Sequence, residues 1–382
     1  MFSLSQIELS QSALENNLKF LKNEFGDSVK FSSVVKGNAY GHGITEFVTM
    51  AKSLGQKHFS VFSVQEARKV KLCGSELGVM IMGYIDEENM GWAILEDVSF
   101  FVFDIHRLKM AVQLAKVVKK PARIHLELET GMNRTGLNGK ELTAAMKILE
   151  KEKDWLYLEG VCTHYAGAES VANFYRIQKQ ISRYHRMYKR IEEKGFKPEF
   201  KHTACSAAAF GFPKTRMDMV RIGIMQYGFW PSYETLTNYF VKRGLRENPL
   251  KRVISWKTRV MAVENVDEGN FIGYGTTYMA RSKMKVAVIP VGYSNGFARD
   301  LSNQGRMLIN GARVGVVGIV NMNMIMVDIS DIPETKVGDE VVLIGEQDGK
   351  EISVASFGEL SNQLNYELLT RLPHDIPRKI VD

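Results

Sequence analysis

The chain has only three cysteines in 382 residues, and Cys73, Cys162 and Cys205 lie far apart in the sequence. This odd, sparse set cannot form a metal-binding cluster by its spacing, and it is typical of reduced thiols inside a cell. No apolar run is long enough to span a bilayer, and the first residues lack the basic and then apolar pattern of a secretory signal. We therefore expect a cytoplasmic protein without a structural metal.

Excess charge is also small, because 50 basic and 43 acidic side chains give a formal net charge of +7. No nucleic-acid recognition motif accompanies the basic clusters at residues 116–120 and 183–194, which we interpret as solvated helix faces. We therefore expect neither nucleic acid nor a membrane as a partner. The length of the chain favours two domains.

Short β-rich segments alternate with longer segments that suit helices in the first part of the chain. Leucines at positions 14, 18 and 21 have helical spacing, and Ser10 or Ser12 can cap that first helix. Eight β-rich segments with crossovers between them predict a parallel sheet closed into a (β/α)8 TIM-like barrel. These segments are residues 31–35, 58–62, 79–84, 100–104, 123–128, 158–165, 200–206 and 219–228.

The pattern changes beyond residue 240. Apolar segments then follow one another, separated by Gly, Asn and Asp turns with little room for helices, which predicts a mainly antiparallel β domain. The fold class is thus α/β, with a barrel over residues 1–240 and a β domain over residues 241–382. We place the linker within residues 241–250, and a helix-like segment at residues 353–372 closes the second domain.

The string SSVVKGNAYGHG (32–43) is the most informative motif. Lys36 stands at the exit of an apolar strand, where desolvation lowers the pKa of an ammonium group and leaves part of it neutral and nucleophilic. A Schiff base with an aldehyde cofactor requires such an amine. Gly37, Gly41 and Gly43 allow a tight turn near a bulky ligand. The alternative is a lysine that ends a strand and faces water.

The whole string resembles the cofactor-lysine motif of alanine racemases, and other motifs follow in the order of that family over essentially the full length. The resemblance implies a barrel that binds pyridoxal 5'-phosphate, followed by a β domain. It also implies a homodimer with shared active sites, a small amino acid as substrate, and alanine as the favoured one. In this family the cofactor is held covalently by the lysine that matches Lys36.

The other site residues are carried over from the motifs TGMNRTGL, THYAGA, HTACSAAAF, VRIGIMQYG, GYGTTY, NMNMIMVD and LNYELL. The resemblance implies that Tyr274 is the second catalytic base, supplied by the second domain. It implies that Arg134 and Met322 bind the substrate carboxylate. The implied cofactor ligands besides Lys36 are His164 beneath the ring, Arg221 at the pyridine nitrogen, and Tyr40, Ser206, Gly223, Ile224 and Tyr366 at the phosphate.

Most of these barrel residues fall at or just beyond the ends of predicted strands, where barrel enzymes build active sites. Racemisation needs one base on each face of the α-carbon, which the resemblance assigns to Lys36 and Tyr274. A chain Tyr274–His164–Arg221 favours the phenolate through a nearby cation. Taken singly, Ser206 has an alternative interpretation as a helix cap, His164 as a core histidine, and the tyrosines as packing aromatics.

Three positions depart from the family pattern. Many members have a carbamylated lysine where this chain has Glu127, and a carboxylate preserves the anion that orients Arg134. The alternative is a strand-end glutamate that faces water. Asn323 and Asn295 stand where the family usually has aspartate, which leaves the substrate less certain than the reaction type.

Other functions remain open at this point. One alternative is a serine or broad-specificity racemase of the same fold. Pyridoxal-phosphate decarboxylases share the architecture, but their Gly-rich phosphate segment and cysteine have no match here. A non-catalytic barrel that binds pyridoxal phosphate is a third alternative, and proteins of that kind lack a second β domain.

Overall fold

The structure is a computed structural model that describes residues 5–244, 246–361 and 365–382. The chain divides into two compact units. We call Ala13–Lys36 with Val48–Lys251 the barrel unit. The β unit comprises Gly37–Phe47, Arg252–Asp382 and the N-terminal residues as far as Ser12.

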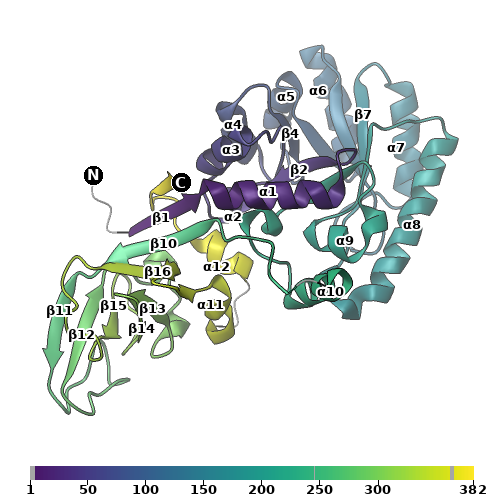
Figure 1. Ribbon diagram of the computed structural model, residues 1–382. Helices are drawn as coiled ribbons and strands as arrows, with labels where there is room; N and C mark the ends of the chain where they lie inside the picture. Colours follow the sequence, from purple (N-terminus) through teal and green to yellow (C-terminus); the bar gives the residue numbers. More distant parts are fainter. Residues whose placement is uncertain (1–4, 245, 362–364) are drawn as a thin grey trace. The chain divides into compact units, whose positions relative to one another are not determined.

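Eight parallel strands form the sheet of the barrel unit, in the order β8-β7-β6-β5-β4-β3-β2-β9 (Figure 1). A parallel bridge between Cys205 and Arg221 joins the two ends of this order. Each predicted segment contains most of one observed strand, which confirms the predicted TIM-like architecture. The strands are β2 (Lys30–Val34), β3 (His58–Val61), β4 (Gly78–Ile81), β5 (Ser99–Val102), β6 (Ala122–Glu127), β7 (Leu156–Cys162), β8 (Phe200–His202) and β9 (Met219–Ile222).

Helices lie between the strands, and local sequence sets where they begin. Capping boxes start two of them, with Ser63 and Glu66 in one and Asn138 and Glu141 in the other. The first helix buries the predicted leucines. The helices are α1 (Gln11–Phe25), α3 (Ile44–Ser53), α4 (Val64–Cys73), α5 (Glu87–Leu95), α6 (Ile105–Val118), α7 (Gly139–Lys151), α8 (Phe174–Glu193), α9 (Ser206–Gly211) and α10 (Tyr233–Arg243).

The β unit contains a seven-stranded sheet in the order β14-β13-β16-β10-β1-β18, with β17 paired to β16, and a three-stranded sheet β11-β12-β15. All pairs except β1 with β18 are antiparallel, which confirms the predicted domain type. Its strands are β10 (Ile254–Arg259), β11 (Ala262–Val266), β12 (Met284–Ile289), β13 (Arg306–Ile309), β14 (Ala312–Gly315), β15 (Ile325–Asp328), β16 (Glu340–Gln347), β17 (Lys350–Ile352) and β18 (Arg378–Val381).

Two segments outside the predicted second domain belong to the β unit. Strand β1 (Ser5–Ser10) lies between β10 and β18, although it opens the chain. The turn at Gly37–Phe47 is the other segment. Helix α10 crosses residue 240, and the barrel unit continues to Lys251. The side chain of Asn17 holds that end, because it exchanges hydrogen bonds of 2.7 and 2.8 Å with the Lys251 backbone.

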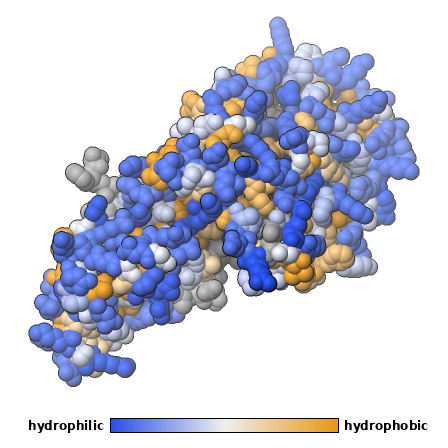
Figure 2. Space-filling model, in the orientation of Figure 1, coloured by the Kyte–Doolittle hydropathy of each residue, from blue (hydrophilic) through white to orange (hydrophobic). Residues whose placement is uncertain are grey.

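The end of the chain is helical where the sequence predicts it. Helices α11 (Val354–Ser361) and α12 (Asn365–Arg371) lie within the predicted segment 353–372, and residues 362–364 are outside the described residues. Among the described residues, no helix is both long and apolar enough to cross a membrane. Figure 2 shows hydrophilic residues over most of one face of the molecule.

Candidate functional site

Lys36 follows β2 and begins a left-handed turn. The segment labelled α2 (Lys36–Tyr40) is not a right-handed helix, because Gly37, Asn38 and Ala39 have φ values of 62°, 54° and 53°. Such a conformation costs a residue with a side chain about 1–2 kcal/mol. The Gly41 amide donates to Gly37 O at 3.0 Å and closes the turn. The predicted need for glycine is confirmed, and backbone strain of this kind clusters at functional sites.

The amine of Lys36 has electrostatic surroundings that suit a nucleophile. The residue is accessible to solvent, yet nearby protein desolvates its ammonium group and lowers its pKa, and the charge of Arg134 lowers the pKa further. Arg221 acts in the same direction with a smaller effect. Lys36, Arg134 and Arg221 are therefore near enough for their charges to interact, and mutual repulsion favours the neutral amine of Lys36.

Arg134 lies in the exposed loop between β6 and α7, where backbone bonds fix the ends of the loop. Leu137 N donates to Glu127 O at 2.8 Å, and Glu129 N donates to Leu137 O at 3.1 Å. The Glu129 carboxylate accepts hydrogen bonds from the amides of Gly131 and Asn133. Glu129 thus organises the loop that carries Arg134. This role of Glu129 was not predicted from the sequence, although a glutamate shortly before a Gly-containing loop is a usable signal.

His164 follows β7 and faces the same cations. Burial lowers its pKa to about 3, and the charges of Arg221, Arg134 and Lys36 contribute to this. His164 is therefore neutral at pH 7. The buried side chain of Gln180, on α8, donates to His164 O at 3.0 Å and holds the loop. Gln180 was not predicted as a functional residue, although a glutamine among the apolar residues of a helix is a usable signal.

Arg221 is a buried residue of β9, and most of its donors are used by the protein. Its Nη1 donates to the His202 ring and to His202 O at 2.8 Å, and its Nη2 donates to Thr163 O at 2.8 Å and Thr203 O at 3.4 Å. Within the described residues, Nε is the guanidinium nitrogen that has no hydrogen bond. No hydrogen bond joins Arg221 to His164 among these residues, so their coupling in the predicted chain is electrostatic.

The residues predicted at the phosphate fall into two groups, and the barrel unit holds the first. Ser206 begins α9 and is buried, and its hydroxyl accepts a 3.0 Å hydrogen bond from the Gly223 amide. Ile224 begins the short 3-10 helix Ile224–Tyr227, where the first amide has no partner within the helix itself. The structure therefore brings Ser206 and Gly223 together, with the Gly223 amide bonded to Ser206, and their role at a phosphate stays a prediction.

The second group lies in the β unit. Tyr40 is buried, and its ring centroid is 6.0 Å from that of Tyr366. Arg378 fixes the turn beside them by donating to Gly41 O at 2.9 Å through Nη2. Two tyrosines more than 300 positions apart in sequence are thus brought together within one unit.

Glu127 is the last residue of β6, and its side chain is buried with 5% of its surface exposed. The interpretation as a strand end in water is therefore wrong. Burial raises the pKa of its carboxyl, whereas a hydrogen bond with Thr135 and the charges of Arg221 and Arg134 oppose that rise. Both arginines face the carboxyl group, and its role in orienting Arg134 stays a prediction.

Tyr274 and Met322 project from neighbouring loops of the β unit. Tyr274 is 74% exposed and stands between Gly273 and Gly275, both with positive φ, while Met322 is 55% exposed. A Cβ added at Gly273 would meet the Met326 side chain, and one added at Gly318 would meet the Ile272 backbone. The segments that carry the two loops therefore pack closely. Tyr274 is not a packing aromatic within this chain.

The two asparagines that depart from the family pattern share one partner. Asn323 Nδ2 donates to Ser294 Oγ at 2.8 Å, and Ser294 Oγ donates to Met322 O at 2.7 Å. Asn295 Oδ1 lies 3.3 Å from the same Ser294 Oγ and also accepts from Gly292 N at 3.1 Å. An ionised aspartate at position 323 would have no donor for Ser294 Oγ. Asn323 and Asn295 therefore act together to fix the loop that carries Met322.

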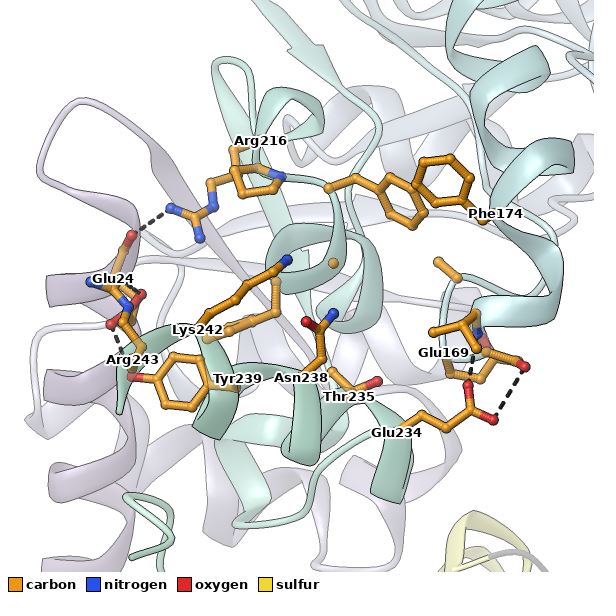
Figure 3. A pocket seen from close by; sticks show the side chains of 17 residues that line it. Glu24, Glu169, Phe174, Arg216, Glu234, Thr235, Asn238, Tyr239, Lys242 and Arg243 are labelled. Carbon is orange, nitrogen blue, oxygen red and sulfur yellow. Dashed lines mark hydrogen bonds and ion pairs between the residues drawn. The ribbon is translucent and has the colours of Figure 1, made fainter. Parts of the chain in front are cut away.

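A separate cavity of about 220 Å³ lies at the side of the barrel unit, between α10 and the segments near Phe174 and Phe212 (Figure 3). Its arginines are engaged, because Arg216 donates to Glu24 O and Arg243 donates to the Glu24 carboxylate, both at 2.6 Å. It contains none of the predicted site residues. Among the described residues, no group of His, Cys, Asp or Glu is arranged to hold a metal ion.

Comparisons with known proteins give one consistent result. Residues 9–231 match the family model for alanine racemase, N-terminal domain, and residues 253–380 match alanine racemase, C-terminal domain. The chain is 32% identical to alanine racemase of Leptospira interrogans serogroup Icterohaemorrhagiae serovar copenhageni over 378 residues. That alignment covers 99% of this chain and 96% of that protein.

Solved structures agree with this result. Alanine racemase from Bacillus anthracis with bound L-Ala-P matches with a TM-score of 0.90 and 31% identity, over 100% of this chain and 96% of that chain. Alanine racemase from Bartonella henselae with covalently bound pyridoxal phosphate matches with a TM-score of 0.84 and 23% identity, over 100% of both chains. The second likeness shows the fold alone.

Proposed function

The chain belongs to the alanine racemase family, and we propose that it interconverts L-alanine and D-alanine with pyridoxal 5'-phosphate bound to Lys36. The observation that carries this proposal is the group of Lys36, Arg134, His164 and Arg221 at the carboxyl ends of the barrel strands. Three cations and a neutral histidine share one space there. Barrel enzymes place their chemistry at this face.

The residues present fit the cofactor. A lysine with a lowered pKa suits covalent attachment of an aldehyde. The unused Nε–H of Arg221 is a donor of the kind that a pyridine nitrogen accepts. The Ser206 hydroxyl, which accepts from Gly223, keeps its own proton for a phosphate oxygen. The resemblance also assigns Tyr40 and Tyr366 to the phosphate, and their rings lie 6.0 Å apart within the β unit.

Pyridoxal phosphate, when bound, withdraws electrons from the α-carbon of an amino acid and makes its α-hydrogen acidic. Lys36 Nζ then exchanges a proton on the face of the D enantiomer, and the Tyr274 hydroxyl does so on the face of the L enantiomer. Arg134 and Met322 hold the substrate carboxylate. Arg221 would donate to the ring nitrogen and, as a permanent cation, would keep a further proton away from it.

We also propose a homodimer in which Tyr274 enters the partner's site. The exposure of Tyr274, at 74%, supports this, because an aromatic ring at a loop tip between two flexible glycines is available to a second subunit. A cytoplasmic location is part of the proposal, and the free thiols of Cys73, Cys162 and Cys205 are compatible with it.

The deciding experiment measures solvent label. The purified protein with pyridoxal phosphate is incubated with L-alanine in deuterium oxide, and the product is analysed for configuration and α-deuterium. We expect D-alanine that carries deuterium. Borohydride reduction of the same sample should fix the cofactor to the peptide that contains Lys36. Label on another lysine, or no inversion, refutes the proposal.

A second candidate substrate follows from Asn323 and Asn295. Because the amides of Asn323 and Asn295 stand where the family usually has carboxylates, near Met322, we propose serine as a second candidate substrate. Rates with L-alanine and L-serine distinguish the two. A higher kcat/KM for L-serine would establish the serine or broad-specificity alternative.

A further inference from the structure

A line of buried polar side chains crosses the interior of the barrel below Arg221. His202 ends β8, His125 lies within β6, and Glu159 lies within β7. Both histidines are completely buried, and Glu159 is 4% exposed. The line ends at Arg123, at the opposite end of β6, where the side chain reaches solvent. Of these four residues, only His202 appears in the site described above, as the partner of Arg221 Nη1.

The direction of every hydrogen bond in this line is set by Arg221. An arginine has no acceptor, so Arg221 Nη1 donates and His202 Nδ1 accepts. A neutral His202 then carries its proton on Nε2, which lies 2.8 Å from His125 Nδ1. That nitrogen of His125 must accept in turn. The proton of His125 is therefore on Nε2.

The far end of the line agrees with this direction. His125 Nε2 faces Glu159 Oε2 at 3.6 Å, slightly beyond hydrogen-bond distance, and it has no closer partner among the described residues. The Glu159 carboxylate is held by Arg123, which donates from Nε at 3.1 Å and from Nη2 at 3.0 Å. The Glu159 carboxylate is thus the anion toward which His125 Nε2–H points.

A further proton on either histidine would set two N–H groups against each other. Burial lowers the pKa of both rings, and the charge of Arg221 lowers both further. Lys30 on β2 and His58 on β3 are the other titratable groups that face this pair. For Glu159, burial alone would raise the pKa, but the nearby His125 ring and the Arg123 guanidinium outweigh burial and lower it.

The surrounding packing gives the line one geometry. The Phe101 ring lies 6.2 Å from the His125 ring and 5.9 Å from the His202 ring. Gly160 leaves room for His125, because an added Cβ would lie 2.1 Å from His125 Nδ1. The buried rings therefore have little freedom to rotate.

We propose that His202, His125 and Glu159 are positioning residues for Arg221, which hold its guanidinium in the orientation that leaves Nε–H available. With Nη1 and Nη2 bonded to the protein, Nε is the donor that remains for the ring nitrogen of the cofactor. This inference rests on the proposed function. The inference adds that buried residues on β6, β7 and β8 determine which nitrogen of Arg221 stays available to the cofactor.

The test uses the full-length protein with pyridoxal phosphate and ¹⁵N-labelled histidine. We expect the imidazole spectra of His125 and His202 to show protonated Nε2 and bare Nδ1, unchanged from about pH 6 to about pH 8. A proton on Nδ1 of either ring, or titration of either ring in this range, overturns the proposal.

Variants connect the line to Arg221. Glu159→Gln removes the anion, and Gly160→Ala displaces His125 without a change of charge. Both should disturb the His202 signal, shift the absorbance band of the bound cofactor, and lower kcat on the order of tenfold or more, with little change in KM. His58→Asn is the control, since His58 is buried in the same barrel and bonds to Ser32 Oγ instead.

The outcomes separate the two proposals. Equal effects of Glu159→Gln and His58→Asn on the His202 signal and on kcat would reduce the line to a structural role and refute the positioning proposal. The expected tautomers in a protein that does not racemise alanine would refute the proposed function, because the cofactor-facing role then has no reaction to serve. Wrong tautomers in an active racemase would refute the positioning proposal alone.

Discussion

Replacing Gly41 by alanine tests the left-handed turn that follows Lys36. Gly41 has a φ of +81°, and a Cβ built there would lie 1.9 Å from Leu369 O and 2.7 Å from Leu369 C. These neighbours are backbone atoms of α12 and cannot rotate away. Either the turn or the helix must move, and both lie within the β unit.

Two costs add in the Gly41→Ala variant. The left-handed conformation costs an alanine about 1–2 kcal/mol. Overpacking against a fixed neighbour costs typically about 1–3 kcal/mol more. We expect the free energy of unfolding to fall by about 2–5 kcal/mol, a large part of the roughly 5–15 kcal/mol that stabilises a typical protein.

Urea unfolding followed by circular dichroism measures this change, with Gly269→Ala as the matched control. Gly269 is also in the β unit and has a φ of +84°, but nothing lies within 4 Å of its built Cβ. Gly269→Ala should therefore lose only the about 1–2 kcal/mol of stability that the left-handed conformation costs an alanine. If the two variants lose the same stability, the close approach of the turn to Leu369 is not what requires glycine at position 41. Cofactor occupancy should fall in Gly41→Ala and stay unchanged in Gly269→Ala.

The remaining predictions concern the site and the barrel. Tyr274→Phe keeps the ring and removes the hydroxyl, so the loss of α-deuterium exchange from L-alanine should far exceed any loss of bound cofactor; equal losses would contradict a role as base. Glu127→Gln should weaken substrate binding and slow turnover together through Arg134, and Glu127→Lys should be partly rescued by bicarbonate; wild-type behaviour of Glu127→Gln would refute its orienting role. Burial holds the pKa of His58 at about 3, below the unfolded value of about 6.5, so its contribution to stability is present above about pH 6.5 and is lost as the pH falls toward 3. Between about pH 7 and about pH 4, the free energy of unfolding should therefore fall less in His58→Asn than in the wild type. Parallel curves of unfolding free energy against pH would contradict this.

The sequence alone was sufficient for features that depend on local pattern. Apolar runs of strand length separated by helix-length segments predicted all eight barrel strands, because burial on both sides of a parallel sheet requires such runs. The motif around Lys36 predicted a tight turn, since glycines at positions 37, 41 and 43 mark positive φ. The resemblance of the motifs to alanine racemases also led to the family that the comparisons established.

Features that depend on which strands become neighbours came only from the tertiary structure. Strand β1 pairs with β10 and β18, about 245 and 370 positions along the chain, and no local pattern encodes such a partner. Likewise, His125, Glu159 and His202 stand on three consecutive strands of the closed barrel, and each alone has the sequence context of an ordinary strand residue. The pairing of β6 with β7 shifts register between Ile124 and His125, which leaves Glu159 without a partner residue in β6, and β8 pairs with β7 on the other side. The register of these strands therefore decided that the three side chains meet beneath Arg221.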